Sequence, residues 1–440
     1  MADTVYRGGI TAGRRHPVIH TSTSRINLFV VALLTILAIP CAEAGVPDPC
    51  PKSNSGMTLV VAANGGTDYK KIQQALDAAR PGDTVLVKAG KYPGGLKFNK
   101  SGSAGACIRL EGEPGAVISG GSTGITIAGK KFIAISGLTV SNISGGNTPT
   151  GIKVSGASSH ISLTKNVVKQ VTSSSNAHAI SFYGTASQPL NNLFIDSNEV
   201  MQNRLGQSEA LVLNGNVELF QISNNKVHDN DNIGIDIIGY EGNGPRGKDF
   251  ARKGFILNNQ VWNNSSGKNS TYGGERSAGG IYVDGGRGIE ISGNKVTNCD
   301  IGIELASEHA GTSTSGIIVK NNDLSNSYQG NLMMGGYDRG RGRADNISIE
   351  GNKLANGRDG ELIIQHNTNG ISIKGNSFRA KGGGYNIYVR GSNNNNPLVE
   401  GNTYASKGPS NDRARKDGSF TMLNERDPAT ARPVRNSRAR

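Results

Sequence analysis

Apolar and polar positions repeat in one short pattern along most of the chain. In nine segments an apolar residue is followed three positions later by Asn, and a second apolar residue stands two positions after that Asn. Successive Asn residues are 24 to 35 positions apart, with no helical pattern between them. A strand repeat of this length predicts a parallel β-solenoid, in which each coil buries its inner face only by stacking on its neighbours. The repeated residues are Asn166, Asn198, Asn225, Asn259, Asn294, Asn322, Asn352, Asn376 and Asn402.

The repeated Asn has a physical role in such a stack. A turn between two strands leaves backbone groups unpaired, and a buried Asn amide bonds both to these groups and to the next Asn along the stack. We therefore interpret these Asn residues as structural. Residues 133–140 look like an earlier coil, with Leu138 in the position of the Asn.

A second series of strands lies between the Asn segments. Each has two apolar residues separated by one other residue, which is the period-2 alternation of a strand with one face in the core. The apolar pair is expected to point inward and the middle residue outward. The segments are 151–156, 179–184, 210–215, 234–239, 280–285, 302–307, 361–366 and 386–391.

Residues 68–80 precede the coils and have a helical pattern. Their apolar side chains fall on one face of a helix, Thr67 or Asp68 is placed to cap its start, and Pro81 ends it. A solenoid needs a cap over its open end, so we predict that this helix covers the N-terminal end of the stack. The apolar face consists of Tyr69, Ile72, Leu76 and Ala79.

The run TLVVAANGGTDYKKIQQALDAARPGDTVLVKAGKY at 58–92, followed by the Asn coils, resembles the pectate-lyase-like right-handed parallel β-helix superfamily. The resemblance covers residues 58–405. It implies an all-β fold, a single-stranded right-handed parallel β-helix with an N-terminal capping α-helix. It does not select an activity, because this architecture hosts lyases, hydrolases, epimerases and non-catalytic sugar-binding proteins.

The N-terminal residues have the features of a secretory signal peptide. An apolar run of 14 residues at 26–39 follows Arg25, and Ala42-Glu43-Ala44 is an A-x-A cleavage site. A membrane anchor is the weaker alternative, because a span needs about 20 apolar residues. Cleavage predicts a secreted protein, extracellular or periplasmic, without membrane contact afterwards. The predicted organisation is a leader at 1–44, a linker at 45–57, the β-helix domain at 58–405 and a basic, partly disordered tail at 406–440.

Three cysteines remain after the predicted cleavage site. An oxidising compartment allows one disulfide, and a bridge from Cys50 to Cys107 would tie the N-terminal segment to the first coils. Cys299 is then unpaired, and we expect it to be a small buried side chain.

Composition and charge narrow the class of partner. The chain has 440 residues, of which 62 are Gly and 5% are aromatic, and its net charge is +13. A basic protein suits an acidic partner, and no basic helix, zinc motif or aromatic RNA-binding signature is present. We therefore expect a monomer that binds an acidic polysaccharide and not nucleic acid.

Carboxyl groups are concentrated at the outward positions of the central coils. Stacking the second strand series places Asp236, Tyr282 and Glu304 in one row, with Asp284 one pleat along from them. Like charges this close repel, and a hard cation such as Ca²⁺, which binds carboxylate oxygens, would offset the repulsion. The expected Ca²⁺ ligands are Asp236, Asp284, Glu304 and Asp231, with Asp229 further out, and the alternative is a solvated acidic turn.

The segment NDNIGIDI resembles the calcium-binding segment of family 9 pectate lyases. Asn232, Gly234 and Asp236 match that segment, whereas Ile233 stands where an Asp is expected. Those lyases use a Lys base on a neighbouring coil, and the corresponding outward place here is Tyr282. The resemblance therefore implies a calcium site but departs at the catalytic base.

These features favour β-elimination of a uronic-acid polysaccharide, pectate- or alginate-like, with Tyr282 or Lys248 as the base. Two other interpretations remain open. Asp236, Asp284 and Glu304 could serve a glycoside hydrolase, or the solenoid could be a non-catalytic carbohydrate-binding or adhesive protein. The predicted substrate-binding residues, in or near the loops at 240–254 and 263–279, are Arg246, Arg252, Arg276, Arg287 and Tyr240.

Overall fold

The computed structural model describes residues 45–52, 56–381 and 384–405, together with short strands between 421 and 433. The predicted signal peptide at 1–44 and most of the predicted tail at 406–440 lie outside the described residues. Among the helices of the described part, none has the length and apolarity that crossing a membrane requires.

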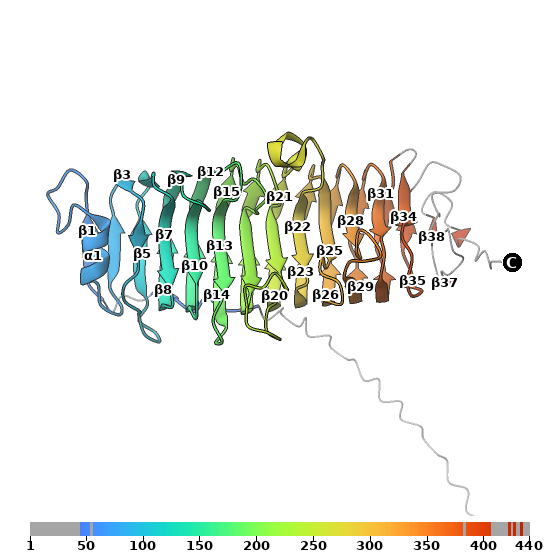
Figure 1. The fold of residues 1–440 in the computed structure, drawn as a ribbon, viewed down its shortest axis with the longest axis horizontal. Helices are drawn as coiled ribbons and strands as arrows, with labels where there is room; N and C mark the ends of the chain where they lie inside the picture. Colours follow the sequence, from blue (N-terminus) through green and yellow to red (C-terminus); the bar gives the residue numbers. More distant parts are fainter. Residues whose placement is uncertain are drawn as a thin grey trace, which may run out of the picture. The chain divides into compact units, whose positions relative to one another are not determined.

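From residue 58 onward the chain forms a right-handed parallel β-helix, which confirms the predicted fold class. The coils contribute strands to three sheets, here named A, B and C. Strands pair in parallel with their counterparts in the neighbouring coils, except that β38 (Arg426–Asp427) and β39 (Arg432–Pro433) pair antiparallel (Figure 1). Strands β10, β13, β22 and β25 of sheet C show this stacking in Figure 1. One α-helix, α1 (Ile72–Ala78), and two 3-10 helices, η1 (Ser266–Lys268) and η2 (Ser270–Tyr272), complete the described elements.

Sheet A contains β1 (Thr58–Val61), β2 (Thr84–Val87), β5 (Ile108–Gly112), β8 (Lys131–Ser136), β11 (Ser159–Thr164), β14 (Leu190–Asp196), β17 (Val217–Ser223), β20 (Arg252–Leu257), β23 (Arg287–Ser292), β26 (Ser313–Lys320), β29 (Arg343–Glu350), β32 (Thr368–Lys374), β35 (Leu398–Glu400) and β37 (Thr421–Leu423). Sheet B contains β3 (Gly90–Pro93), β6 (Ala116–Ser119), β9 (Thr139–Ser144), β12 (Val167–Thr172), β15 (Glu199–Met201), β18 (Lys226–His228), β21 (Gln260–Trp262), β24 (Lys295–Thr297), β27 (Asp323–Ser325), β30 (Lys353–Ala355), β33 (Ser377–Arg379), β36 (Thr403–Tyr404), β38 (Arg426–Asp427) and β39 (Arg432–Pro433). Sheet C contains β4 (Leu96–Lys97), β7 (Thr123–Ala128), β10 (Thr150–Ser155), β13 (His178–Gly184), β16 (Leu211–Gly215), β19 (Ile235–Ile238), β22 (Gly279–Asp284), β25 (Ile301–Ala306), β28 (Gly330–Met334), β31 (Gly360–Ile364) and β34 (Tyr385–Val389).

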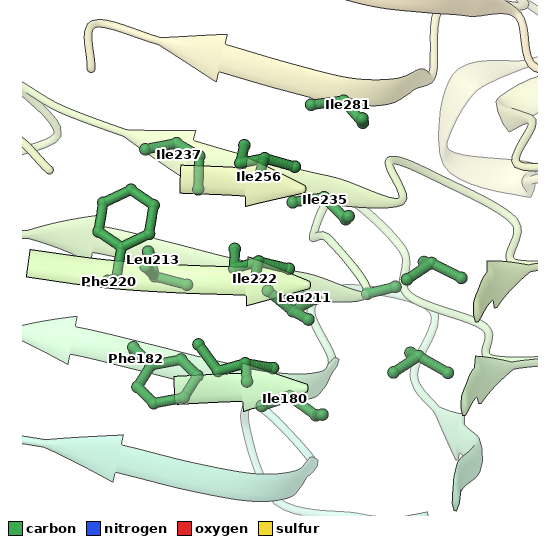
Figure 2. Close-up of a cluster of buried hydrophobic side chains, with 14 of the residues drawn as sticks. Ile180, Phe182, Leu211, Leu213, Phe220, Ile222, Ile235, Ile237, Ile256 and Ile281 are labelled. Carbon is green, nitrogen blue, oxygen red and sulfur yellow. The ribbon is translucent and has the colours of Figure 1, made fainter. Parts of the chain in front are cut away.

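The core follows the predicted alternation. In sheet C the two apolar residues of each strand point inward, and burying one Ile or Leu side chain contributes roughly 2 kcal/mol. The residue between them lies on the outer face, which places Asp236 there. Figure 2 shows inward side chains of sheet C, Ile180, Phe182, Leu211, Leu213, Ile235, Ile237 and Ile281, together with Phe220, Ile222 and Ile256 of sheet A.

The Asn ladder forms as predicted. The Oδ1 of Asn225 accepts hydrogen bonds from the backbone N–H and the Nδ2 of Asn198, at 2.9 and 3.0 Å. Its own Nδ2 donates to the carbonyl of Ile195 and to Oδ1 of Asn259. The same amide-to-amide contact recurs from Asn166 to Asn402. Leu138 is buried in the Asn position, and its N–H donates to Asn166.

A second, shorter Asn ladder explains the unpaired cysteine. Asn203, Asn230 and Asn264 stand five positions after ladder residues, and their amides bond to one another in the same way. Cys299 occupies the next position in this stack, with its Sγ 4.0 Å from Nδ2 of Asn264. The sequence-based expectation of a small buried side chain is confirmed, and the ladder supplies its position.

We expect Cys299 to resist thiol reagents in the native protein. It is fully buried, and burial raises the pKa of its thiol to about 12, so the reactive thiolate is scarce. In protein cleaved after Ala44, which no longer contains Cys41, a thiol-reactive dye should give no labelling in native buffer and one equivalent per chain in denaturant without reductant. One equivalent of rapid labelling in native buffer would contradict this position.

The capping helix is present but starts later than predicted. It begins at Ile72, its N-cap is Lys71, and no side chain caps it. Neither predicted cap is available, because Asp68 accepts a hydrogen bond from Val60 N–H and the hydroxyl of Thr67 donates to the carbonyl of Tyr69. The predicted apolar face does join the core of the first coils.

The predicted disulfide between Cys50 and Cys107 is present. The buried guanidinium of Arg109, in β5, donates to the carbonyl of Cys50 at 2.9 Å and so holds the same segment. The segment predicted as a linker is therefore fastened to sheet A. At the other end, β37 pairs in parallel with β35, so sheet A extends past the predicted domain end at 405.

Candidate active site on sheet C

Asp236, Tyr282 and Glu304 lie opposite one another in the adjacent strands β19, β22 and β25. Neighbouring strands are about 4.8 Å apart, so the three residues form the predicted row on the outer face of sheet C. The row continues through Val212 before Asp236 and through Met333 after Glu304. Its carboxyl groups are therefore confined to the central coils.

Most of this row is covered, although it belongs to the outer face. Asp236 is 2% exposed, Tyr282 6% and Asp284 4%. Glu308, in the loop after β25, contributes to the cover: its Oε1 accepts from the hydroxyl of Tyr282 at 3.4 Å, and its N–H donates to Oδ1 of Asp284 at 2.9 Å. Glu308 thus ties the loop to the row.

Six carboxyl groups influence one another around this row. Glu209 and Asp284 both raise the pKa of Asp236, and Glu241 raises the pKa values of Glu209 and Asp284. Mutual effects of this kind require the groups to be close. We call the set the acid cluster, and it consists of Glu209, Asp236, Glu241, Asp284, Glu304 and Glu308.

Burial is the main cause of the perturbed acidity. Burial first, and then neighbouring carboxylates, raise the pKa values of Asp236 and Asp284 well above their usual range. The same causes raise the pKa of Glu209 and that of Glu304 to about 8. The pKa of about 8 favours the protonated form of Glu209 and Glu304 at neutral pH, and the pKa values of Asp236 and Asp284 are shifted in the same direction. A carboxyl with a raised pKa beside substrate is what a general acid requires.

We expect the stability of the protein to fall as pH rises from 4.5 to about 8. The folded-state pKa of Glu209 is above its ordinary value of 4.5, so the folded protein binds more protons in this range than the unfolded chain does. His178 acts in the opposite direction and only between pH 6.5 and 4, because burial lowers its pKa to about 4. Melting temperatures measured at pH 6 and pH 8.5 should differ less in Glu209→Gln than in the wild type. The exposed Glu275→Gln is the control, and an unchanged difference in Glu209→Gln would contradict the assignment.

Asp236 differs from the other acids in its hydrogen bonding. Its Oδ1 is buried and has no hydrogen-bond partner among the described residues. Leaving a buried polar atom unpaired costs about 1–3 kcal/mol. Such atoms call for a specific explanation, and a catalytic role is one that fits a carboxyl on an outward row.

His178 and Tyr183 of β13 adjoin the acid cluster. Nδ1 of His178 lies 3.2 Å from the carbonyl oxygen of Glu209, which only accepts, so Nδ1 carries the proton. Nε2 then accepts from the hydroxyl of Tyr183 at 3.1 Å. The 3.5 Å contact between His178 and the Glu209 carboxyl joins two groups that are uncharged at neutral pH, since their pKa values are about 4 and about 8.

The loop at 263–279, drawn with a yellow coil in Figure 1, is held by a buried anchor. Asp300 is fully buried and accepts from Ser265, Ser266 and the Nε of Arg276. From this loop Tyr272 approaches the acid cluster, because Glu209, Glu308 and Asp236 all raise its pKa.

Two of the predicted substrate-binding residues, both arginines, bind partners within the protein. Arg276 pairs with Asp300 at 2.8 Å and lies over the ring of Tyr328. Arg252 bonds to Asn216 and Glu218. These two guanidinium groups hold loops and strands together, and sequence reasoning did not anticipate their partners.

The remaining predicted residues lie around the loop after β19. Arg287 lies over the rings of Tyr240 and Phe250, and the hydroxyl of Tyr240 is buried without a partner among the described residues. Arg246 and Lys248 are exposed in the same loop. Of the two predicted bases, Lys248 and Tyr282, only Tyr282 belongs to the outward row and so lies beside the acid cluster.

Asp231 lies apart from the acid cluster. Its Oδ1 accepts from the N–H of Leu205 at 2.7 Å, and it does not contribute to the raised pKa of Asp236. With Asp229 and Lys268 it lines two cavities, of about 670 and 660 Å³, at the corner that follows the strands of sheet B. Burial raises the pKa of Asp231 in these cavities, but the acid cluster combines several such carboxyl groups, so we place the candidate site on sheet C.

The expected calcium ligands are only partly brought together. Asp236 and Glu304 lie in the outward row with Asp284 beside them, whereas Asp231 lies apart from it. Within the ranges that the structure describes, no set of three or more His, Cys, Asp or Glu side chains is arranged to hold a metal ion. Calcium binding therefore stays a prediction.

Sequence reasoning missed Glu209, Glu308 and His178. One signal could have found two of them: Glu209 and His178 both stand three positions before the outward residue of their strands, Val212 and Ser181. Extending the second strand series by a few residues would have aligned them. Glu308 belongs to a loop, and no repeat marks it.

Comparison with known proteins gives one sequence relative and several structural ones. The chain is 38% identical to the uncharacterized protein YwoF of Bacillus subtilis (strain 168) over 356 residues, which is 75% of this chain and 76% of YwoF. No family model matches the chain.

Solved structures share the fold at low identity. The A-module of mannuronan C-5 epimerase AlgE6 from Azotobacter vinelandii is 14% identical, with a TM-score of 0.57 over 81% of this chain and 94% of that chain. The catalytic domain of a GH87 alpha-1,3-glucanase is 14% identical, with a TM-score of 0.55 over 86% and 71%. PfbA, a surface adhesin of Streptococcus pneumoniae, is 15% identical, with a TM-score of 0.52 over 81% and 84%. At these identities the likeness establishes the β-helix fold alone.

Proposed function

We propose that this chain, which belongs to the same family as YwoF and has the pectate-lyase-like parallel β-helix fold, is a secreted enzyme. It cleaves a polysaccharide by acid–base catalysis. The secreted location is supported by the signal-peptide pattern at 1–44 and by the disulfide between Cys50 and Cys107, which suits an oxidising compartment. A polysaccharide as substrate class is supported by the names of the epimerase and the glucanase that share the fold.

The observation that carries the proposal is the state of Asp236. It is buried at the centre of the outward row, burial and neighbouring carboxylates raise its pKa well above the usual range, and its Oδ1 has no hydrogen-bond partner among the described residues. A carboxyl with these properties donates a proton to a glycosidic oxygen placed against Oδ1. Donation at this atom makes the departing sugar a better leaving group.

A second carboxyl must accept the proton of the attacking water. Glu308 is exposed and already accepts from the hydroxyl of Tyr282, which orients it beside Asp284. Glu308 is the candidate base, because its carboxyl is exposed beside the row. Glycoside hydrolysis, with Asp236 as the acid and Glu308 as the base, is therefore the reaction that these carboxyls support best.

β-Elimination of a uronic-acid polysaccharide is the second candidate, and the pair of Tyr183 with His178 favours it. A phenol that donates to an imidazole nitrogen provides a path for a proton beside the acid cluster. The calcium dependence expected from the sequence belongs to this second candidate, and removal of divalent cations tests it.

Product analysis separates these reactions. The purified protein is incubated with pectate, alginate and neutral glucans, with and without EDTA. New reducing ends without ultraviolet absorbance support hydrolysis, whereas an absorbing unsaturated product supports elimination. Loss of activity in EDTA would support the calcium prediction, and binding without cleavage of any polymer would overturn the enzymatic proposal in favour of an adhesive role.

A further inference from the structure

A separate polar cavity lies on sheet C next to the acid cluster. Its volume is about 420 Å³, and it is formed by outward residues of β10 and β13 and by the turns that flank them. Lys153 of β10 is its cation, and Thr150, Ser155, Ser181 and Tyr183 contribute hydroxyl groups. We call this cavity the Lys153 pocket.

Lys153 stands in the same outward row as Asp236. The row runs from Lys153 through Ser181 and Val212 to Asp236, one residue per strand. Three strand steps of about 4.8 Å place the two residues about 14 Å apart along the stack. A chain-like substrate lying along sheet C would therefore cross both the pocket and the general acid.

Lys153 has no acidic partner among the described residues, and its charge contributes to the lowered pKa of His178 after the larger effect of burial. The side chain is exposed, and no carboxylate of the described residues forms an ion pair with it. The row also contains Lys97 of β4, two strands beyond Lys153 on the side away from Asp236. In the strand register Lys97 lies opposite Thr126, and Thr126 lies opposite Lys153. The outward row is thus basic at one end and acidic in the middle.

The hydrogen bonding of the pocket leaves donors for a ligand. The hydroxyl proton of Tyr183 is committed to Nε2 of His178, and the proton of Nδ1 is committed to the carbonyl of Glu209. The ammonium group of Lys153 and the hydroxyl of Ser181 remain as donors that face the cavity. An ammonium with adjacent hydroxyl groups is a typical anion-binding set.

We propose that the Lys153 pocket binds an anionic group, a carboxylate or a sulfate ester, on a sugar residue of the substrate. The proposal rests on the proposed function and adds the substrate class: a negatively charged polysaccharide that spans the pocket and the acid cluster. Lys153 acts here as a specificity-determining residue, remote from the bond that is cleaved.

The test measures binding in the absence of cleavage. In an Asp236→Asn background, affinities for polygalacturonate, dextran sulfate and neutral dextran are measured at two salt concentrations. Lys153→Gln should weaken binding of the preferred anionic polymer about tenfold and reduce its salt dependence, and Lys153→Arg should restore most of the affinity. Lys226→Gln, an exposed lysine of β18 in sheet B, is the matched control and should bind like the parent.

The two anionic polymers identify the group, since tighter binding of polygalacturonate indicates a carboxylate and tighter binding of dextran sulfate indicates a sulfate. Equal affinity for dextran and both anionic polymers, or unchanged anion binding in Lys153→Gln, would overturn the inference. Failure of the proposed function looks different, because it appears as full cleavage activity in Asp236→Asn or as no cleavage by the wild type.

Discussion

Replacing Asp236 with Asn is expected to lower kcat by about 10²–10⁴-fold, the usual contribution of a general acid. Asn keeps the size of the side chain but has no acidic proton to donate, and Oδ1 of Asp236 has no hydrogen-bond partner among the described residues. Fold and stability should be retained, because burial and the neighbouring acids disfavour the charged form of Asp236 and Asn is uncharged. The measurement is kcat and KM on the polymer that the wild type cleaves, with circular dichroism to verify folding.

The matched control is Asp323→Asn, an exposed acid in β27 of sheet B. It should leave kcat unchanged. Activity of Asp236→Asn within threefold of the wild type would remove Asp236 from the mechanism and leave the acid cluster without its proton donor.

Replacing Asn225 with Ala is expected to destabilise the coils around it by about 4 kcal/mol. The substitution leaves the N–H of Asn198 and the carbonyl of Ile195 buried without partners, and each unpaired group costs about 1–3 kcal/mol. The ladder is continuous, so the loss falls at the interface between two coils, where a stacked repeat depends on its neighbours.

Hydrogen exchange with mass spectrometry measures this loss locally, alongside the melting temperature. The amides of β14 and β17 should exchange faster in Asn225→Ala, and the first coils should change less. Asn191→Ala, at a half-buried position of β14, serves as the control with an effect below about 0.5 kcal/mol. A melting temperature equal to that of the wild type would refute the structural role of the ladder.

The repeat made most of the fold predictable. The spacing from an apolar residue to Asn to another apolar residue identifies the turn, and period-2 alternation identifies the inward face of each strand. Together these patterns set the register, so that Asp236, Tyr282 and Glu304 could be placed in one row from the amino-acid sequence. The start of α1 was missed because backbone and side-chain contacts of the first turn take up Thr67 and Asp68.

The composition of the site was less predictable. Arg276 was expected to bind substrate, but the fully buried carboxylate of Asp300, 24 positions away, pairs with it. Asp231 was expected to bind a cation, but its carboxylate accepts from the backbone of Leu205 in the preceding coil. In both cases the partner lies in another coil, where sequence spacing gives no information.

The sequence by itself therefore determined the solenoid, its register and the row of outward residues, because these follow from a local pattern repeated in every coil. Only the tertiary structure decided that burial and neighbouring carboxylates raise the pKa values of the acids of this row, and that Glu209, Glu308 and His178 join them. The physical reason is that acidity depends on burial and on charges brought close in space. Loops of irregular length provide part of this burial and some of these nearby charges. Contacts between coils determine the paths of the loops.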